Sequence, residues 1–258
     1  MNRFAALVCL FFPIATTHAG GISVEQRNVA GCTVRLVRVP PDSYRVRIGL
    51  AQGRVGLTES LAGIAKRYGA VAAINGCFFD AYAKGTIKFP WHNLIKGGEV
   101  VHIGNTGTTV VIAYGMVLST GGAGSLIARD GCVLAYWRGE AGIARRFKPD
   151  MKCSYRVEYE GTSDPRFWSG VCEAIGCGAR LLKADQVCYN PTSEGFSHAK
   201  ILSASGARSA IGTTRDRQLH LVATNCTVRK LADVMTALGA YDAMNLDGGI
   251  SCGLYGKG

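Results

Sequence analysis

The sequence has few acidic side chains for its length. Asp and Glu total 18 against 29 Lys and Arg, so the formal net charge of the 258-residue chain is +11 at pH 7. The basic side chains are scattered, which argues against nucleic-acid binding, because that function concentrates positive charge on one face. A diffuse positive field instead suits an anionic ligand such as a phosphate or an acidic glycan.

The sequence also lacks any long apolar run after its N-terminus, so no stable membrane insertion is expected. Residues 1–19 have the pattern of a secretory signal peptide. Arg3 supplies the charged start, residues 4–15 the apolar centre, and residues 17–19 a small-x-small cleavage signal. We therefore predict that this segment is removed and that the domain of residues 20–258 is secreted or periplasmic.

No compact C-x-x-C pair is present, and its absence disfavours a structural zinc site. Zinc bound by Cys172, Cys177, Cys188 and His198 is therefore the minor alternative. Cys9 lies within the apolar centre of the signal peptide, too early for a lipoprotein cleavage site, so no lipid anchor is expected. Export makes disulfides the default for the other nine cysteines. Because nine is odd, at least one thiol stays free or pairs with another chain.

Two units, Leu61–Asn75 and Leu231–Asn245, resemble each other. In each, apolar residues at helical spacing lead to a glycine that ends the helix, and a short apolar strand then ends in Asn. Thr58 and Thr227 precede the two helices as expected N-caps. Convergence is the alternative, because such units are common. Six of the fifteen aligned positions are identical, namely the pairs Leu61/Leu231, Ala62/Ala232, Gly69/Gly239, Ala70/Ala240, Ala73/Ala243 and Asn75/Asn245.

Each repeated unit leads into a loop that contains candidate site residues. NGCFF occupies residues 75–79, and NLDGG occupies residues 245–249. Asp247 follows a buried strand, and the glycines Gly248 and Gly249 leave room for a ligand beside its carboxylate. An ordinary Asp-Gly turn is the alternative. Because the two units are alike, we expect these loops to be neighbours, with a site where the two strands end.

Further candidates lie on other loops. Trp91 and His92 stand together in FPWHN, and aromatic rings beside polar groups often bind sugars. Packing of an aromatic ring under a long loop is an equally good interpretation. Arg208 stands among Ser, Ala and Gly residues that leave its guanidinium room to meet a ligand. His220 alternates with apolar residues and is expected on the exposed face of a strand.

Strand patterns outnumber helical patterns. Residues 32–50 are predicted to form a hairpin with its turn at residues 40–42, and further strands are expected within 94–103 and 108–118. Residues 119–170 carry no motif and are interpreted as an insertion. These patterns predict a single α+β domain of largely antiparallel or mixed sheets packed with two principal helices.

Four motifs in order resemble those of the phosphodiester glycosidase family: NGCFF, IGCGARLL, EGF followed by RSAIG, and GAYDAMNLDGG. The usual family forms are NGGFF, a GGGPRL-like turn, RTAIG and NLDGGGSS. The resemblance covers Thr58–Ser251, except for the insertion. It implies hydrolysis of a sugar C1–O–phosphate linkage in a carbohydrate phosphodiester or anionic glycan, without a cofactor.

By position, the resemblance implies a site made of Asn75, Arg208, Asp247, Gly248 and Gly249. Asp247 would act as the nucleophile or as the base that activates water, and Arg208 would hold the phosphate. Asn75 would bind a hydroxyl or phosphate oxygen, and the glycine amides would form an anion nest. Retention or inversion stays open, as does the oligomeric state. His92 and Glu194 are reserve acid/base candidates; a cation held by Asp247 and Asn245 is a minor alternative.

The departures from the family motifs are cysteines. Cys77, Cys177 and Cys252 replace Gly or Ser, which suggests a disulfide among them, with Cys77–Cys252 as the first pairing to consider. A Cys77 nucleophile with His92 as its base is disfavoured, because an exported, cysteine-rich chain rarely keeps a free thiolate. The main rival from another class is a polysaccharide-binding module of the cell envelope that keeps the fold without turnover.

Overall fold

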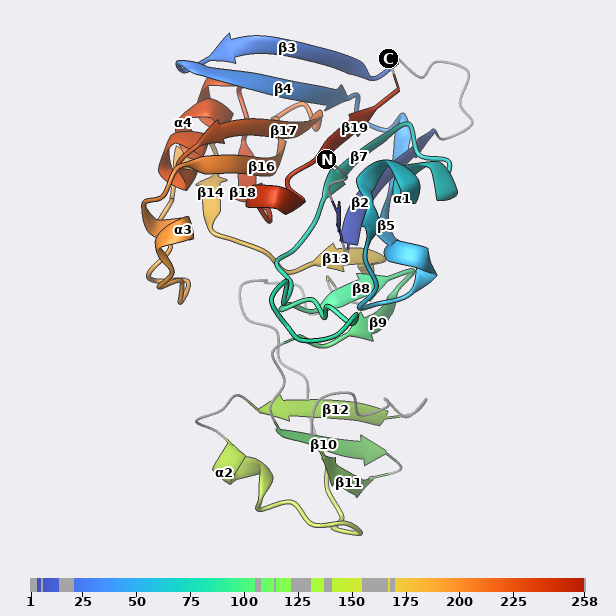
Figure 1. Cartoon of the computed structure of the whole chain (residues 1–258). Helices are drawn as coiled ribbons and strands as arrows, with labels where there is room; N and C mark the ends of the chain where they lie inside the picture. Colours follow the sequence, from blue (N-terminus) through green and yellow to red (C-terminus); the bar gives the residue numbers. More distant parts are fainter. Residues whose placement is uncertain are drawn as a thin grey trace.

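The body of the protein is built from two antiparallel sheets that pack face to face, with a helix on each outer side (Figure 1). This α+β architecture confirms the fold class predicted above. The structure is a computed structural model that describes residues 4–5, 7–13, 21–104, 108–113, 115–121, 131–136, 141–154, 167 and 170–257.

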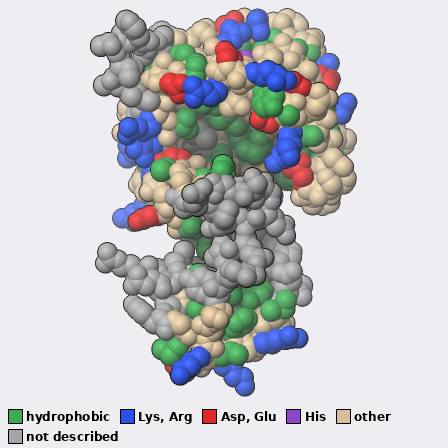
Figure 2. Space-filling view, turned by 180° about the vertical axis from the view of Figure 1, so that it is seen from behind, with side chains coloured by type: hydrophobic (Ala, Val, Ile, Leu, Met, Phe, Trp, Pro, Cys, Tyr) green, Lys and Arg blue, Asp and Glu red, His purple; other side chains and the backbone are tan. Residues whose placement is uncertain are grey.

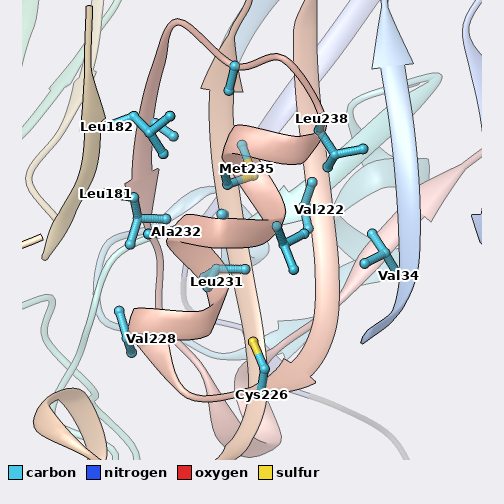
Figure 3. Close-up of a cluster of buried hydrophobic side chains, with 14 of the residues drawn as sticks. Val34, Leu181, Leu182, Val222, Cys226, Val228, Leu231, Ala232, Met235 and Leu238 are labelled. Carbon is cyan, nitrogen blue, oxygen red and sulfur yellow. The ribbon is translucent and has the colours of Figure 1, made fainter. Parts of the chain in front are cut away.

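The larger sheet has seven strands, in the order β15-β14-β18-β16-β17-β4-β3. Helix α4 (Val228–Ala237) covers its outer face with Leu231, Ala232 and Met235, which the structure buries completely (Figure 3). The helix is amphipathic, so one apolar stripe meets the sheet. The strands are β3 (Ser23–Val29), β4 (Cys32–Val39), β14 (Arg180–Lys183), β15 (Gln186–Val187), β16 (Gly206–Thr213), β17 (Leu219–Cys226) and β18 (Asp242–Asn245).

The smaller sheet has four strands, in the order β19-β7-β2-β5. Helix α1 (Leu61–Arg67) packs on its outer face against Ala73. The neighbouring residues Ala72 and Ile74 point the other way and meet Leu221 between the sheets, as strand alternation requires. The strands are β2 (Leu7–Pro13), β5 (Tyr44–Leu50), β7 (Ala72–Asn75) and β19 (Leu254–Gly256).

A separate small sheet, β11-β10-β12, lies apart from the main body in Figure 1. It combines the segment predicted as strand, 108–118, with the first part of the predicted insertion. Ile112, Val117 and Ala144 form its own core. The remaining elements are β1 (Phe4–Ala5), the short helical turn Ala51–Gly53, β6 (Glu59–Ser60), β8 (Leu94–Lys96), β9 (Glu99–His102), β10 (Thr108–Ala113), β11 (Met116–Gly121), β12 (Gly131–Tyr136), α2 (Ala141–Ala144), β13 (Glu173–Ile175), α3 (Ala199–Leu202) and the turn Gly249–Ser251.

The two repeated units fold as predicted, with one difference at a helix start. Gly69 and Gly239 follow α1 and α4 with φ of 67° and 77°, the left-handed conformation that ends a helix at glycine. Thr227 caps α4 by accepting a hydrogen bond from the Lys230 amide. The prediction that Thr58 caps α1 is wrong. Ser60 caps this helix by accepting a hydrogen bond from the Gly63 amide, because Thr58 stands too far ahead of the first turn.

Two other strand predictions are also wrong. β4 and β5 occupy the expected positions but do not pair, because the chain passes from the larger sheet to the smaller one at residues 40–42. His220 is 2% exposed rather than on a wet face. A strand inside this sheet is covered on both faces, by α4 on one side and by the second sheet on the other. Burial lowers the pKa of His220 to about 4.

The apolar centre of the predicted signal peptide forms a strand in this structure. β2 pairs with β5 on one side and β7 on the other, with Val8 opposite Asn75. The cleavage signal at residues 17–19 lies outside the described residues. Removal of residues 1–19 stays a prediction, and it would take a strand from between β5 and β7. No helix among the described residues has the length and apolar character to cross a membrane.

Candidate active site

Asp247 stands where β18 ends, and its main chain is held from three directions. Its amide donates to the Gly76 carbonyl at 2.9 Å. Its carbonyl accepts from Asn75 Nδ2 at 2.6 Å and from Ser209 Oγ at 2.8 Å. The loops that follow the two repeated units therefore meet at Asp247, as the sequence predicted.

Asn75 acts on the main chain in this structure. Its side chain is 1% exposed, and its Oδ1 accepts from the Gly253 amide at 3.0 Å while its Nδ2 holds Asp247. Its repeat counterpart Asn245 also binds main chain, by donating to the Gly178 carbonyl at 2.7 Å. Both asparagines thus fasten loops around the site.

The Asp247 carboxyl group is the most perturbed acid in the described site. Burial raises its pKa to about 6, and the Ser251 hydroxyl, the Gly248 amide, Lys200 and Arg208 pull it the other way. A carboxyl group poised near neutral pH accepts or releases a proton readily, which is the behaviour of a catalytic acid or base.

Arg208 is 5% exposed and largely bound to main chain. Its Nη2 donates to the carbonyls of Lys200 and Ala204 at 2.6 and 2.7 Å, and its Nε donates to the Cys226 carbonyl at 3.3 Å. Its Nη1 faces Gly248, where an added Cβ would lie 3.1 Å away. Nη1 is therefore the part of the guanidinium that points toward the Asp247 loop.

Lys200 is a second cation near Asp247. It follows His198, the N-cap of α3, and its charge lowers the pKa of Asp247. Its Nζ hydrogen-bonds the Tyr82 hydroxyl at 3.2 Å and lies 5.4 Å from the centre of that ring, and Tyr82 is 87% exposed. Lys200 and Tyr82 thus mark the solvent side of the site.

The two glycines beside Asp247 shape the loop around its carboxylate. The Gly248 amide donates to Asp247 Oδ1 at 2.9 Å, so it orients the carboxylate. A Cβ at Gly248 would lie 2.7 Å from the Ala207 carbonyl oxygen, so only glycine fits. Gly249 has φ of 67°, and this left-handed residue starts the turn that brings Ser251 back to Asp247.

A cluster of aromatic rings lies on the side of the site where Cys177 is found. The Phe78 ring is 6.3 Å from Trp91, 6.2 Å from His92 and 5.9 Å from Phe196 between ring centres. Trp91 is 46% exposed, and burial lowers the pKa of the half-buried His92. The FPWHN segment therefore presents an aromatic surface of the kind that contacts sugars.

Glu194 lies beside the turn that precedes β14. Both oxygens of its carboxylate accept from the Arg180 amide, at 3.0 and 3.1 Å. An added Cβ at Gly178 would lie 3.1 Å from Glu194 Oε2 and 2.8 Å from the Phe196 ring. Because the Gly178 carbonyl also binds Asn245, this turn connects Glu194 to the end of β18.

The three cysteines at motif positions form no disulfide, nor do the other six that the structure describes. Burial raises the pKa of the Cys177 thiol strongly, with Cys77 as the next largest cause. The Cys252 thiol donates to the Arg208 carbonyl at 3.2 Å. Cys177 is thus the neighbour of Cys77 here, and the expected Cys77–Cys252 bond is not formed. A thiol with a raised pKa makes a poor nucleophile at neutral pH.

Metal ligands do not converge in the described part of the chain, where no three His, Cys, Asp or Glu side chains could hold an ion. The zinc alternative built on Cys172, Cys177, Cys188 and His198 therefore has no ligand cluster. A cavity of about 470 Å³ lies at the other end of the large sheet, where Arg38, Gln218 and His220 line it. It contains none of the candidate site residues.

Charged side chains do not gather on the face that Figure 2 shows. Lys and Arg are spread over it and alternate with Asp and Glu. This distribution agrees with the scattered basic residues of the sequence.

Comparisons with known proteins support the α+β fold and the protein family that the motifs indicated. A profile of the phosphodiester glycosidase family matches residues 68–258, and the chain belongs to this family. The family and the fold support a glycosidase-type function. No curated protein matches the sequence.

Several solved structures share the fold, and three of them illustrate the similarity. A hypothetical protein from Synechocystis has 19% identity and a TM-score of 0.65, over 92% of this chain and 58% of that one. A candidate exported protein of Burkholderia pseudomallei has 14% identity and a TM-score of 0.56, over 86% and 69%. The catalytic domain of zebrafish N-acetylglucosamine-1-phosphodiester alpha-N-acetylglucosaminidase, auto-inhibited by its pro-peptide, has 13% identity and a TM-score of 0.50, over 96% and 78%.

The sequence did not identify several residues in the surroundings of Asp247. Ser209 follows Arg208 in RSAIG, and Ser251 follows the glycine pair, so both stood inside motifs and could have been found there. Lys200 and Tyr82 lie in segments with no distinctive pattern. Only the fold brings them to the site.

Proposed function

We propose that the exported protein hydrolyses a sugar-1-phosphodiester, with Asp247 acting at the anomeric carbon. The observation that carries this proposal is the Asp247 carboxyl group, whose main chain is clamped by Asn75, Ser209 and Gly76 and whose pKa is about 6. A carboxylate held in this way can attack the anomeric carbon or take a proton from water. It needs no metal for either step.

The neighbouring cations suit the leaving group. When the C1–O bond breaks, the departing phosphate monoester has a second pKa near 6, so it leaves without strong protonation. Lys200 and Arg208 Nη1 supply positive charge on the Asp247 side that faces the phosphate. Trp91 and His92 provide the aromatic surface for the sugar, and Glu194 is the second carboxylate within the surrounding loops.

The test uses methyl phosphodiesters of N-acetylglucosamine, glucose and galactose in ¹⁸O-labelled water. Cleavage of the C1–O bond puts ¹⁸O on the sugar, whereas cleavage at phosphorus puts it on the phosphate. We expect label on the sugar and a loss of at least about 1,000-fold in kcat for Asp247→Asn, the order expected for loss of a catalytic nucleophile. Label on phosphate, or an Asp247→Asn variant with wild-type turnover, would overturn the mechanism.

A matched control is available on the same strand. Asp242 in β18 is exposed and accepts from the Ala184 amide, so Asp242→Asn removes a charge and keeps an acceptor. We expect this variant to retain wild-type turnover. If the protein is instead a binding module, the wild-type protein should bind the phosphodiesters without releasing sugar. Equilibrium dialysis with the same phosphodiesters would detect this binding.

A further inference from the structure

Cys32 and Cys226 face each other where β4 and β17 end their pairing. Cys32 is the first residue of β4, and Cys226 is the last residue of β17. Val34 lies opposite Thr224 in this antiparallel pair. Because antiparallel pairing advances one residue on each strand, two further steps place Cys32 opposite Cys226 on the same face as Val34.

Both side chains reach the core beneath α4. Figure 3 shows Cys226 among the apolar side chains that surround this helix, and Cys32 packs against the same group. Burial, followed by the neighbouring Cys32 thiol, raises the pKa of Cys226 to about 12, and a hydrogen bond between the two thiols adds to the effect. The two thiols are therefore neighbours in this core.

We infer that Cys32 and Cys226 form a disulfide bond in an oxidising compartment. Residues directly opposite in an antiparallel pair have Cα atoms about 4.5–5.5 Å apart, within the range of roughly 4.4–6.8 Å that disulfides require. The two thiols lose two protons and two electrons as the S–S bond forms. The disulfide of an oxidising thiol–disulfide exchange protein accepts them and becomes a dithiol.

The bond would brace the part of β17 that orients Arg208. The Cys226 carbonyl accepts from Arg208 Nε at 3.3 Å. A link from Cys226 to β4 holds that carbonyl in place and closes a long loop of chain, which lowers the entropy of the unfolded state. The raised pKa of Cys226 slows exchange in the folded protein, so the bond forms before α4 covers the core.

Peptide mapping tests the bond directly. The full chain, recovered from an oxidising compartment, is unfolded in acid without reductant, blocked with N-ethylmaleimide and digested. We expect one species that contains the Cys32 and Cys226 peptides and weighs two hydrogens less than their sum. Maleimide on either cysteine, or linkage of either one to a different cysteine, would overturn the inference.

A stability measurement gives a second readout. Cys226→Ser should lower the Tm without reductant by on the order of 5–10 °C. Full reduction of both proteins should remove most of that difference, because neither then has the bond. A Tm difference that is equal with and without reductant would assign the effect to packing and reject the bond. If Cys226→Ser does not fold, the same comparison is made with Cys32→Ser, because Cys32 is only half-buried.

Discussion

The side chain of Asn75 donates to the main-chain carbonyl of Asp247 at 2.6 Å, across 172 positions of sequence. With its Oδ1 on the Gly253 amide, Asn75 fastens β7 to both the Asp247 loop and the approach to β19. A side chain of one repeated unit thus holds the main chain of the loop that follows the other unit. The candidate carboxylate consequently depends on contacts between both sheets.

Asn75→Ala should destabilise the protein and reduce turnover. The substitution removes one of two donors to the Asp247 carbonyl, which keeps Ser209 Oγ, and takes the acceptor from the buried Gly253 amide. The expected cost is about 1–3 kcal/mol in the free energy of unfolding. Urea unfolding measures the stability. Asn28 on β3 is exposed, so Asn28→Ala is the control and should leave the curve unchanged. An equal, small effect of both variants would contradict the clamp.

Asp247→Asn should stabilise the protein at neutral pH. The pKa of Asp247 is about 6 in the folded state against an ordinary 3.8, so the folded protein binds this proton more tightly than the unfolded chain does. The tighter binding of this proton stabilises the folded state below about pH 4, and this stabilisation is lost as the pH rises through 6. At pH 8 the buried charge costs about 3 kcal/mol, which the amide avoids.

Urea unfolding of wild type and Asp247→Asn between pH 4 and pH 8 checks this sign. The difference in unfolding free energy should grow from near zero at pH 4 to its full value above pH 7. A difference that is constant across the range would mean that the Asp247 carboxyl has an ordinary pKa.

Lys200→Met should raise KM for a sugar phosphodiester and shift the pH–activity curve upward. Activity that needs the ionised carboxylate rises as the pH passes through about 6, and Lys200 lowers the pKa of that carboxyl. Steady-state kinetics across pH 5–8 separates the two effects. Lys183→Met, at an exposed position on β14, is the control. An unchanged KM and an unchanged curve for Lys200→Met would remove Lys200 from the site.

We predict that export removes residues 1–19, so that the mature chain begins at Gly20. The charged start, the apolar centre and the small-x-small signal of residues 1–19 predict cleavage there. Intact mass and N-terminal sequencing of protein recovered outside the cytoplasm measure the start of the chain. Retention of Leu7–Pro13 would contradict cleavage and would keep β2 between β5 and β7.

Local patterns were most informative where structure depends on nearby residues. The helices that end at Gly69 and Gly239 and the short strands after them follow from apolar periodicity and from the freedom of glycine at positive φ. His220 was mispredicted because alternation along one strand cannot reveal that α4 covers the face opposite Leu221. The hairpin of residues 32–50 failed for a similar reason, since strand pairing is a long-range property.

For the candidate site, too, the sequence predicted some features and the fold decided the others. Asp247, Asn75 and Arg208 stood in motifs, so the sequence named them as candidates, but it could not predict the main-chain hydrogen bonds of Asn75 and Arg208. Arg208 Nη2 and Nε bind carbonyls of α3, the Ala204 turn and β17, and both polar atoms of the Asn75 side chain bind main chain. Hydrogen-bond partners of a buried polar group come from whichever segments cover it, and those segments are distant in sequence.

By itself, the sequence determined the family, the α+β class and the position of one acidic residue at a strand end, because these depend on residue identities and short spacings. Tertiary structure alone decided the environment of that acid. Burial raises the Asp247 pKa, and Lys200 and Ser251 oppose the rise, because a group's desolvation and its neighbouring charges are set by the segments that fold around it.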